Sequence, residues 1–534
     1  MANVHREDGW IFSVFLRNGS RTIVGKICRF GHIPMQIAIL TRVEMRYPQC
    51  MRNPMSFRPV QLAIAPMLAV SAPLFAQAVS PASSATGVKP PENILPIAPV
   101  QAAPQPVPLP QLSATQEQFL RDWLAQGATQ GLSIARTSPV SLTGDALVRT
   151  ALDRARALHV GRVDPSDFLE VWALRPAAYD PLPAFADAVS ADRLSQWAND
   201  LTPPYAGYEG LKKGLFTYES IRDQGGWPKL VAASDAATVR ARLAIEDPAV
   251  TPNEKLVDAL QRAQRRYGLN PTGQLDARTL AALNVPVEDR IKAIMANMER
   301  WRWLPRELPV NRVQVNIAAA VLTVFEGDNP VSSMRAVTGS PGNETPMLVS
   351  NIHSIVVNPP WNVPQSIAKK ELWPKGRATL LREGYKILGT PETGQRIVQP
   401  AGPNSALGRL KFDFSNPFAV YLHDTPARAK FSSYDRLASH GCVRLEKPIP
   451  LAELMMRDDP AFAGRIQEVI DAGKTRRVQL PKEVAVYLLY WTAFASSNGT
   501  MNFRADPYNW DKLLASKIED SSRRAATTAI ASKE

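Results

Sequence analysis

The chain has 534 residues, 45% of them hydrophobic, and a formal net charge of +13 at pH 7. This length gives room for roughly two to four domains, and this apolar fraction is ordinary for globular proteins. The excess of basic over acidic residues is compatible with binding to an anionic polymer or to a membrane surface. A nucleic-acid binder is disfavoured, because the basic residues are dispersed and no base-reading module occurs.

Residues 56–78 have the pattern of a secretory signal peptide. Arg58 provides a positive start, an apolar stretch runs from Leu62 to Phe75, and Ala76-Gln77-Ala78 has the small-x-small form of a cleavage site. Prolines interrupt the stretch, which is shorter than the ~20 residues that span a bilayer. We therefore expect export to the periplasm, with an uncleaved membrane tether as the alternative.

Two further segments flank this signal. We expect residues 1–55 to be an upstream extension, because Met51 and Met55 stand where a natural start would be expected. Residues 79–113 are rich in Pro and Ala, a composition that cannot bury a core and favours an extended spacer.

The three cysteines are Cys28, Cys50 and Cys442. Removal of the leader leaves Cys442 as the single thiol, so an intrachain disulfide is excluded. A lone cysteine near histidines is a candidate nucleophile. With six histidines in the whole chain, a structural zinc site is disfavoured, and we expect neither a metal nor a cofactor.

The pattern from residue 114 to 248 predicts helices, and we name this stretch the scaffold segment. Apolar residues recur there at helical spacing. No chemical motif occurs, which favours a structural role. The stripes contain Phe119, Leu120, Trp123 and Leu124, then Leu147, Leu152, Ala155 and Leu158, then Leu194, Trp197 and Leu201.

Residues 249–300, the three-helix segment, are more specific. Thr251-Pro252-Asn253-Glu254 reads as a capping box that opens a helix, Gly268 is placed to end it, and Asp276 is a second N-cap. The order Leu260-Gln261…Tyr267-Gly268-Leu269…Gly273…Asp276…Thr279…Leu283 resembles the small three-helix peptidoglycan-binding domain. Most of these positions are caps and core, so glycan binding by this copy stays open.

Residues 311–515, the β domain, change to strand patterns. Residues 313–317, 321–325, 418–422 and 484–489 are strand candidates, and Ser497-Asn498-Gly499 predicts a hairpin turn. Residues 516–534 are expected to be a tail. The predicted fold class is thus multidomain α+β: a helical scaffold, a small three-helix domain and a mainly β domain.

The candidate chemistry lies between residues 421 and 444. His423-Asp424 is followed, after fifteen residues counted from Asp424 to Ala438, by Ser439-His440-Gly441-Cys442. A thiol attacks a carbonyl as thiolate, so it needs a base or a positive field nearby. A histidine supplies both and can return the proton to a leaving amine, provided a third group holds its tautomer. A buried structural cysteine with two ordinary histidines is the competing interpretation.

The signature His…Ser-His-Gly-Cys resembles that of the L,D-transpeptidase (YkuD-type) catalytic domain. Residues 358–364 and 403–412 are also similar to that family. So is the order of signal, helical scaffold, peptidoglycan-binding segment and catalytic domain, which is that of the large YcbB-like periplasmic members. The resemblance implies that residues 362–410, the lid insertion, form a lid over the active site.

The resemblance also assigns site residues. Cys442 would be the nucleophile and His440 or His423 the base, a choice that spacing leaves open. Asp424 would orient the imidazole through its backbone carbonyl, although its carboxylate could instead cap the following turn. Ser439 would shape the site and help to bind substrate. The amides of Gly441 and Cys442 would form the oxyanion hole.

Three further residues are expected to bind substrate. Arg444, two residues after the cysteine, could contact a stem-peptide carboxylate or serve as a structural ion-pair partner. Tyr421 and Trp361 could line the cleft together with Trp373, or belong to the core.

The implied reaction is 3→3 cross-linking of peptidoglycan through a cysteinyl acyl-enzyme. The implied partners are stem peptides and glycan, and other cell-wall synthases are candidates. An L,D-carboxypeptidase or a lipoprotein-to-wall ligase would use the same chemistry. A catalytically inert peptidoglycan-binding scaffold is the rival of a different class, which the intact thiol and histidines argue against.

Overall fold

The computed structural model describes residues 17–18, 21–22, 108–126, 130–133 and 142–531. The predicted signal peptide, nearly all of the upstream extension and most of the Pro/Ala-rich spacer lie outside these residues. Two compact units are distinguished, residues 1–100 and 101–534. The described residues of the first form β1 (Arg17–Asn18) and β2 (Arg21–Thr22), an antiparallel pair.

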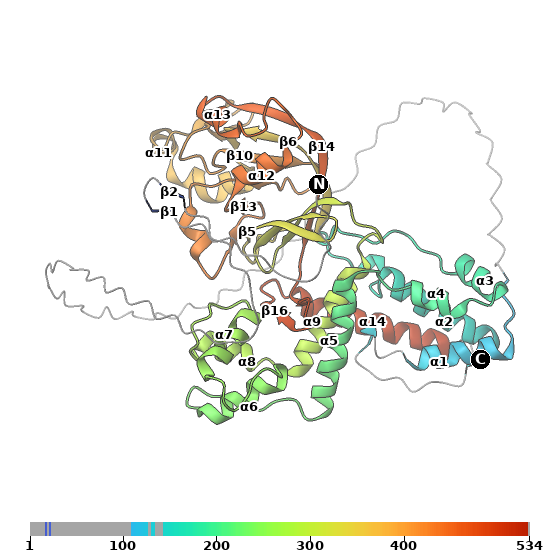
Figure 1. Cartoon of the computed structure of the whole chain (residues 1–534). Helices are drawn as coiled ribbons and strands as arrows, with labels where there is room; N and C mark the ends of the chain where they lie inside the picture. Colours follow the sequence, from blue (N-terminus) through green and yellow to red (C-terminus); the bar gives the residue numbers. More distant parts are fainter. Residues whose placement is uncertain (1–16, 19–20, 23–107, 127–129, 134–141, 532–534) are drawn as a thin grey trace, which may run out of the picture. The chain divides into compact units, whose positions relative to one another are not determined.

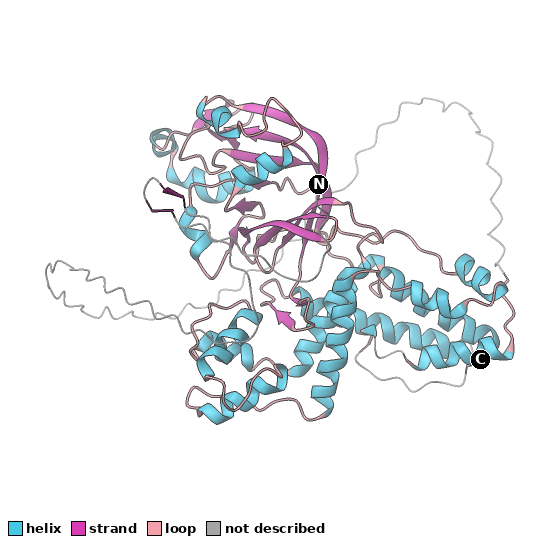
Figure 2. Cartoon of the chain, in the orientation of Figure 1, coloured by secondary structure: helices cyan, strands magenta, loops and turns pink. Residues whose placement is uncertain are grey.

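The second unit joins a helical region to a mainly β region (Figures 1 and 2). This confirms the predicted α+β class. Within the described part of the chain, no helix is both long enough and apolar enough to cross a membrane.

The first four helices of the scaffold segment pack around their own apolar core, whereas its last two contribute buried residues to the main core. Leu120, Leu147, Ala155 and Leu158, all predicted for the apolar stripes, are buried in the core of the first four helices. A capping box between Ser113 and Gln116 begins the first helix. The helices are α1 (Ala114–Ala125), α2 (Gly144–Val160), α3 (Leu182–Ser190), α4 (Leu194–Asp200), α5 (Ala206–Asp223) and α6 (Ala236–Glu246), with a 3₁₀ turn, η2 (Pro165–Asp167).

The three-helix segment contains α7 (Leu256–Arg266), α8 (Ala277–Leu283) and α9 (Val287–Arg302). The Asp276 side chain accepts a hydrogen bond from Thr279 N at 2.8 Å, which confirms the predicted N-cap. The predicted capping box at Thr251–Glu254 is wrong, because α7 begins after Lys255 without a side-chain cap. Its carboxylate, Glu254, is instead paired with the Arg262 guanidinium.

The β domain contains a nine-stranded sheet in the order β12-β5-β13-β11-β10-β6-β14-β3-β4. An additional pairing of β4 with β5 closes this sheet on itself, and apolar side chains from these strands fill the main core. The strands are β3 (Asn311–Asn316), β4 (Val321–Glu326), β5 (Asn329–Gly339), β6 (Leu348–Val357), β10 (Leu410–Phe414), β11 (Leu422–His423), β12 (Leu437–Ser439), β13 (Val443–Leu445) and β14 (Arg476–Leu489).

The predicted strand at 418–422 is wrong over most of its length. Only Leu422 belongs to β11, and Ala419 adopts a positive φ of 52°. The physical reason is Asn416, whose side chain accepts from Phe418 N and Val420 N and donates to the Val420 carbonyl. An Asx-type turn therefore replaces sheet pairing over these apolar residues.

Elements after β13 return the chain to the helical region. β15 (Ala493–Ala495) and β16 (Met501–Phe503) form the predicted hairpin. Residues 516–531, expected as part of a tail, continue α14 (Trp510–Ala531), whose Ser522 hydroxyl donates to the Leu132 carbonyl. Three short helical segments, η5 (Arg428–Ser432), α12 (Pro448–Met455) and α13 (Ile466–Asp471), complete the β domain.

The lid insertion is a small folded unit with its own sheet, in the order β7-β9-β8. Val363, Leu372, Leu380 and Ile397 are among the buried residues of its separate core. Its elements are β7 (Trp361–Asn362), α10 (Gln365–Ile367), the π-helical turn η3 (Ala368–Leu372), η4 (Trp373–Lys375), α11 (Arg377–Arg382), β8 (Lys386–Leu388) and β9 (Arg396–Gln399).

Candidate active site

Three neighbouring strands bring the predicted catalytic residues together. His423 on β11 is opposite Arg444 on β13 and opposite Lys411 on β10. Because side chains alternate along strands, residues two positions earlier, Tyr421 and Cys442, continue the same face. The nucleophile candidate and His423, nineteen residues apart in sequence, therefore lie on adjacent chain segments that run parallel.

The Cys442 thiol is partly buried, and its Sγ lies 4.0 Å from the carbonyl oxygen of Ala419. Burial raises the pKa of this thiol above its usual value. Hydrogen bonding from the backbone and hydroxyl of Tyr421 lowers the pKa, as do the charges of Lys411 and Arg444. The surroundings therefore contain the groups that would stabilise a thiolate once it forms.

His423 is buried, and its Nδ1 lies 2.5 Å from the backbone carbonyl oxygen of Asp424. Burial, together with the charges of Arg444 and Lys411, lowers the pKa of His423 to about 3, although the hydrogen bond to Asp424 acts in the opposite direction. The ring is therefore neutral at pH 7. Since a carbonyl accepts only from N–H, Nδ1 carries the hydrogen and Nε2 keeps a free lone pair.

His440 has a different environment. Its Nε2 lies 2.6 Å from a carboxylate oxygen of Glu371, which belongs to η3 of the lid insertion. Both side chains are more than one third exposed, at 39% and 42%. His440 thus connects the catalytic motif to the lid insertion.

The hydrogen bonds around Gly441 determine which backbone amide remains available to donate to an oxyanion. The Ser439 hydroxyl donates to the Cys442 carbonyl at 2.5 Å and accepts from Gly441 N at 3.2 Å. Of the two amides expected for the oxyanion hole, that of Gly441 is therefore engaged. Among the described residues the amide of Cys442 makes no hydrogen bond. Gly441 has a φ of 106°, which a residue with a Cβ rarely adopts.

Asp424 uses both its backbone and its side chain. Beyond the carbonyl contact to His423, its carboxylate accepts from Arg409 N at 2.8 Å and from the Arg428 guanidinium at 3.1 Å. Of the two roles considered from the sequence, the carbonyl contact is present, whereas the turn after Asp424 is capped by Thr425, whose hydroxyl accepts from Ala427 N at 3.2 Å. Through Arg409 the carboxylate also fixes the end of the lid insertion.

The predicted substrate-binding residues lie in different places. Arg444 is partly buried, which lowers its pKa, and its side chain makes no hydrogen bond or ion pair among the described residues. The Tyr421 ring lies edge-on to His423 at 5.6 Å, with the Lys411 ammonium 4.3 Å from its centre. Trp361 is partly buried against the core of the lid insertion.

Glu371, Lys411 and Thr345 were not selected from the sequence as site residues. Lys411 stands in a family-like stretch, but a single lysine carries no signal of its proximity to Cys442. Glu371 and Thr345 reach the catalytic motif over 69 and 96 residues of chain. No local pattern reports contacts of that range.

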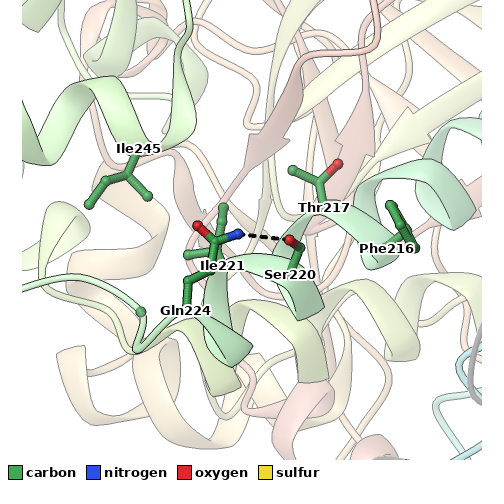
Figure 3. Close-up of a pocket in the computed structure, with 7 residues that line it drawn as sticks. Phe216, Thr217, Ser220, Ile221, Gln224 and Ile245 are labelled. Atoms are coloured by element: carbon green, nitrogen blue, oxygen red, sulfur yellow. Dashed lines mark hydrogen bonds between the residues drawn. The ribbon is translucent and has the colours of Figure 1, made fainter.

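Figure 3 shows a surface pocket of the scaffold segment, and none of these groups belongs to its lining. It is formed by α5, the residues that follow α5, and α6, and it contains no His, Cys, Asp, Glu or Lys. Its lining residues are Phe216, Thr217, Ser220, Ile221, Gln224, Gly226 and Ile245. Among the residues that the structure describes, no group of three or more His, Cys, Asp or Glu side chains could hold a metal ion.

Comparison with protein families gives three matches. Residues 310–463 match the family described as "L,D-transpeptidase catalytic domain". Residues 146–215 match a "Scaffold domain", and residues 252–283 match a "Putative peptidoglycan binding domain".

A curated Haemophilus influenzae protein described as "Putative L,D-transpeptidase" is 30% identical over 223 residues. The match covers 38% of this chain and 45% of the relative, so it spans less than half of the relative's length.

Among solved structures, an L,D-transpeptidase from Stackebrandtia nassauensis is 15% identical, with a TM-score of 0.20, over 47% of this chain and 88% of that chain. One from Mycobacterium smegmatis is 16% identical, with a TM-score of 0.18, over 34% of this chain and 58% of that chain.

Proposed function

Since the chain carries a YkuD-type L,D-transpeptidase catalytic domain after a scaffold domain and a peptidoglycan-binding domain, we propose that it cross-links peptidoglycan through an acyl-enzyme on Cys442. The observation that supports this proposal is that Cys442 directly precedes β13, which runs parallel to β11, while His423 on β11 is oriented by the Asp424 carbonyl. A buried structural cysteine would not need an oriented histidine on a neighbouring segment.

The first step forms the acyl-enzyme. His423 Nε2 accepts the thiol proton while Sγ of Cys442 attacks the carbonyl carbon of the third stem residue, which we take to be diaminopimelate. The amide of Cys442, free of other hydrogen bonds, donates to the developing oxyanion. The tetrahedral species then collapses, the peptide bond breaks, and His423 returns the proton to the departing amine of D-alanine.

The second step transfers the acyl group. The side-chain amine of a neighbouring stem attacks the thioester, loses a proton to His423, and expels the sulfur, which is reprotonated. The product is a 3→3 cross-link. Water as acceptor would give an L,D-carboxypeptidase, and a lipoprotein amine would give a wall ligase, with the same residues acting.

Geometry favours His423 over His440 as the base. His423 lies opposite the strand that follows Cys442, and its tautomer is held by Asp424. His440 directs Nε2 to Glu371 instead, which suits a role in holding the lid insertion near the motif. The unpaired Arg444 guanidinium suits a carboxylate of the stem peptide.

This function implies an extracytoplasmic location, because the polymer lies outside the cytoplasm, and the predicted signal peptide supports export to the periplasm. The peptidoglycan-binding domain would contact glycan. Other cell-wall synthases, which supply the uncross-linked polymer, are candidate partners.

The test is intact-protein mass spectrometry of the purified protein incubated with a carbapenem, beside Cys442→Ala. We expect an adduct on the wild type and none on the variant. An unmodified wild-type protein would contradict the proposal and favour an inert binding scaffold. Muropeptide analysis after incubation with stem tetrapeptides then distinguishes 3→3 transfer from hydrolysis.

A further inference from the structure

Thr345 is a fully buried residue in the loop between β5 and β6, and its hydroxyl joins two backbone groups. It accepts from Gly339 N at 2.8 Å and donates to the carbonyl oxygen of Gly441 at 2.8 Å. The Tyr508 hydroxyl ties the same loop, since it accepts from Thr345 N at 3.3 Å and donates to the Gly339 carbonyl at 2.6 Å. The Thr345 hydroxyl is thus held where it meets the peptide just before Cys442.

The contact fixes the orientation of one peptide group. The Gly441 carbonyl and the Cys442 amide belong to the same planar trans unit, so they point in opposite directions. Holding the carbonyl toward Thr345 directs the amide away from it. Without that hold, Gly441 would offer little resistance to rotation of the unit, because glycine populates both signs of φ.

We propose that Thr345 is a positioning residue that orients the Cys442 amide as the oxyanion donor. The inference rests on the proposed function, in which Cys442 attacks a carbonyl. It assigns no contact with substrate to Thr345, which acts only through the Gly441–Cys442 peptide.

The loop that carries Thr345 is itself anchored to the scaffold segment. Met347 N donates to the Val171 carbonyl at 2.8 Å, and Leu174 N donates to the Met347 carbonyl at 2.9 Å. On the other side, Gly339 allows the loop to approach β5, since a Cβ there would lie 2.1 Å from the Asn343 carbonyl oxygen. The scaffold segment and β5 therefore hold the loop from both sides.

The experiment compares two reactions of the same thiol in wild type, Thr345→Val and Thr345→Ser. Acylation by a carbapenem passes through an oxyanion, whereas alkylation by iodoacetamide needs only the thiolate. We expect Thr345→Val to slow acylation about tenfold or more, because an oxyanion donor is misaligned. Alkylation should stay within about twofold, since the thiolate needs no such donor. Thr345→Ser, which keeps the hydroxyl, should retain both rates.

Thr323→Val is the matched control, because Thr323 carries an exposed hydroxyl on β4. Equal acylation by wild type and Thr345→Val would overturn the proposal, and so would a parallel loss of both reactions. If Thr345→Val does not fold, Tyr508→Phe replaces it, because that substitution removes the other hydroxyl that holds the loop. It should show the same selective loss of acylation. Unchanged acylation in Tyr508→Phe would also overturn the proposal. Failure of the proposed function is distinct, since the wild type itself would then form no adduct.

Discussion

The Nδ1 atom of His423 lies 2.5 Å from the backbone carbonyl oxygen of Asp424. A backbone carbonyl cannot change its protonation state, so it selects one tautomer of the ring without adding a charge. The free lone pair of Nε2 follows from this contact. The two histidines of the motif should therefore not be equivalent.

Substitution of each histidine tests this difference. We expect His423→Gln to slow acylation of Cys442 by about a hundredfold or more, because the proton acceptor is lost. His440→Gln should leave most of the activity, since its ring contacts Glu371. The measurement is the time course of the carbapenem adduct by mass spectrometry. A larger loss in His440→Gln than in His423→Gln would assign the base to His440.

The buried neutral ring of His423 should make the fold sensitive to acid. Its pKa is about 3 in the folded chain and about 6.5 when unfolded, so between these values only the unfolded chain binds the proton. The free energy of unfolding should therefore fall as the pH drops below 6.5, by about 2 kcal/mol at pH 5 from this group alone. Urea unfolding of wild type and His423→Gln between pH 7 and 5 measures the difference. Identical pH dependence would contradict the assignment.

The Lys411 ammonium should favour the thiolate of Cys442. It lies 2.7 Å from the Asp413 carboxylate and 4.3 Å from the centre of the Tyr421 ring, and its charge lowers the pKa of Cys442. Lys411→Met keeps the side-chain length and removes the charge, so the pKa of Cys442 should rise. The rate of iodoacetamide alkylation against pH reports the midpoint. Lys482→Met, at an exposed position, is the control, and a common shift in both variants would refute the effect.

Replacement of Gly408 by alanine should lower the free energy of unfolding for two separable reasons. Its φ is 60°, and a Cβ there would lie 2.4 Å from a carboxylate oxygen of Asp424. Gly394, also in the lid insertion, has a φ of 83° but no atom within 4 Å of such a Cβ. Gly394→Ala should cost about 1 kcal/mol from backbone strain, and Gly408→Ala should cost roughly 1–3 kcal/mol more from the overlap. Urea midpoints of the two variants measure this, and equal losses would exclude the overlap.

Some features of the fold and of the candidate site can be predicted from local sequence patterns, and others cannot. The helical stripes, the Asp276 cap and the grouping of Ser439, His440 and Cys442 depend on neighbours within a few residues, so their patterns are readable locally. Errors arose where a side chain bound a partner that the local pattern did not indicate. Arg262 engaged Glu254, and Asn416 bent the apolar stretch that was expected to be a strand.

By itself the sequence determined the order of the segments, the α+β class and the nucleophile candidate Cys442, because composition and spacing carry that information. Only the tertiary structure decided which histidine hydrogen-bonds to the Asp424 carbonyl. It also decided that the amide of Cys442, and not that of Gly441, is without a hydrogen bond among the described residues. It also brought Lys411 and Thr345 to the motif. The physical reason is that strand register and buried hydrogen bonds join residues far apart in the chain, and the packing of the whole sheet determines which of them meet.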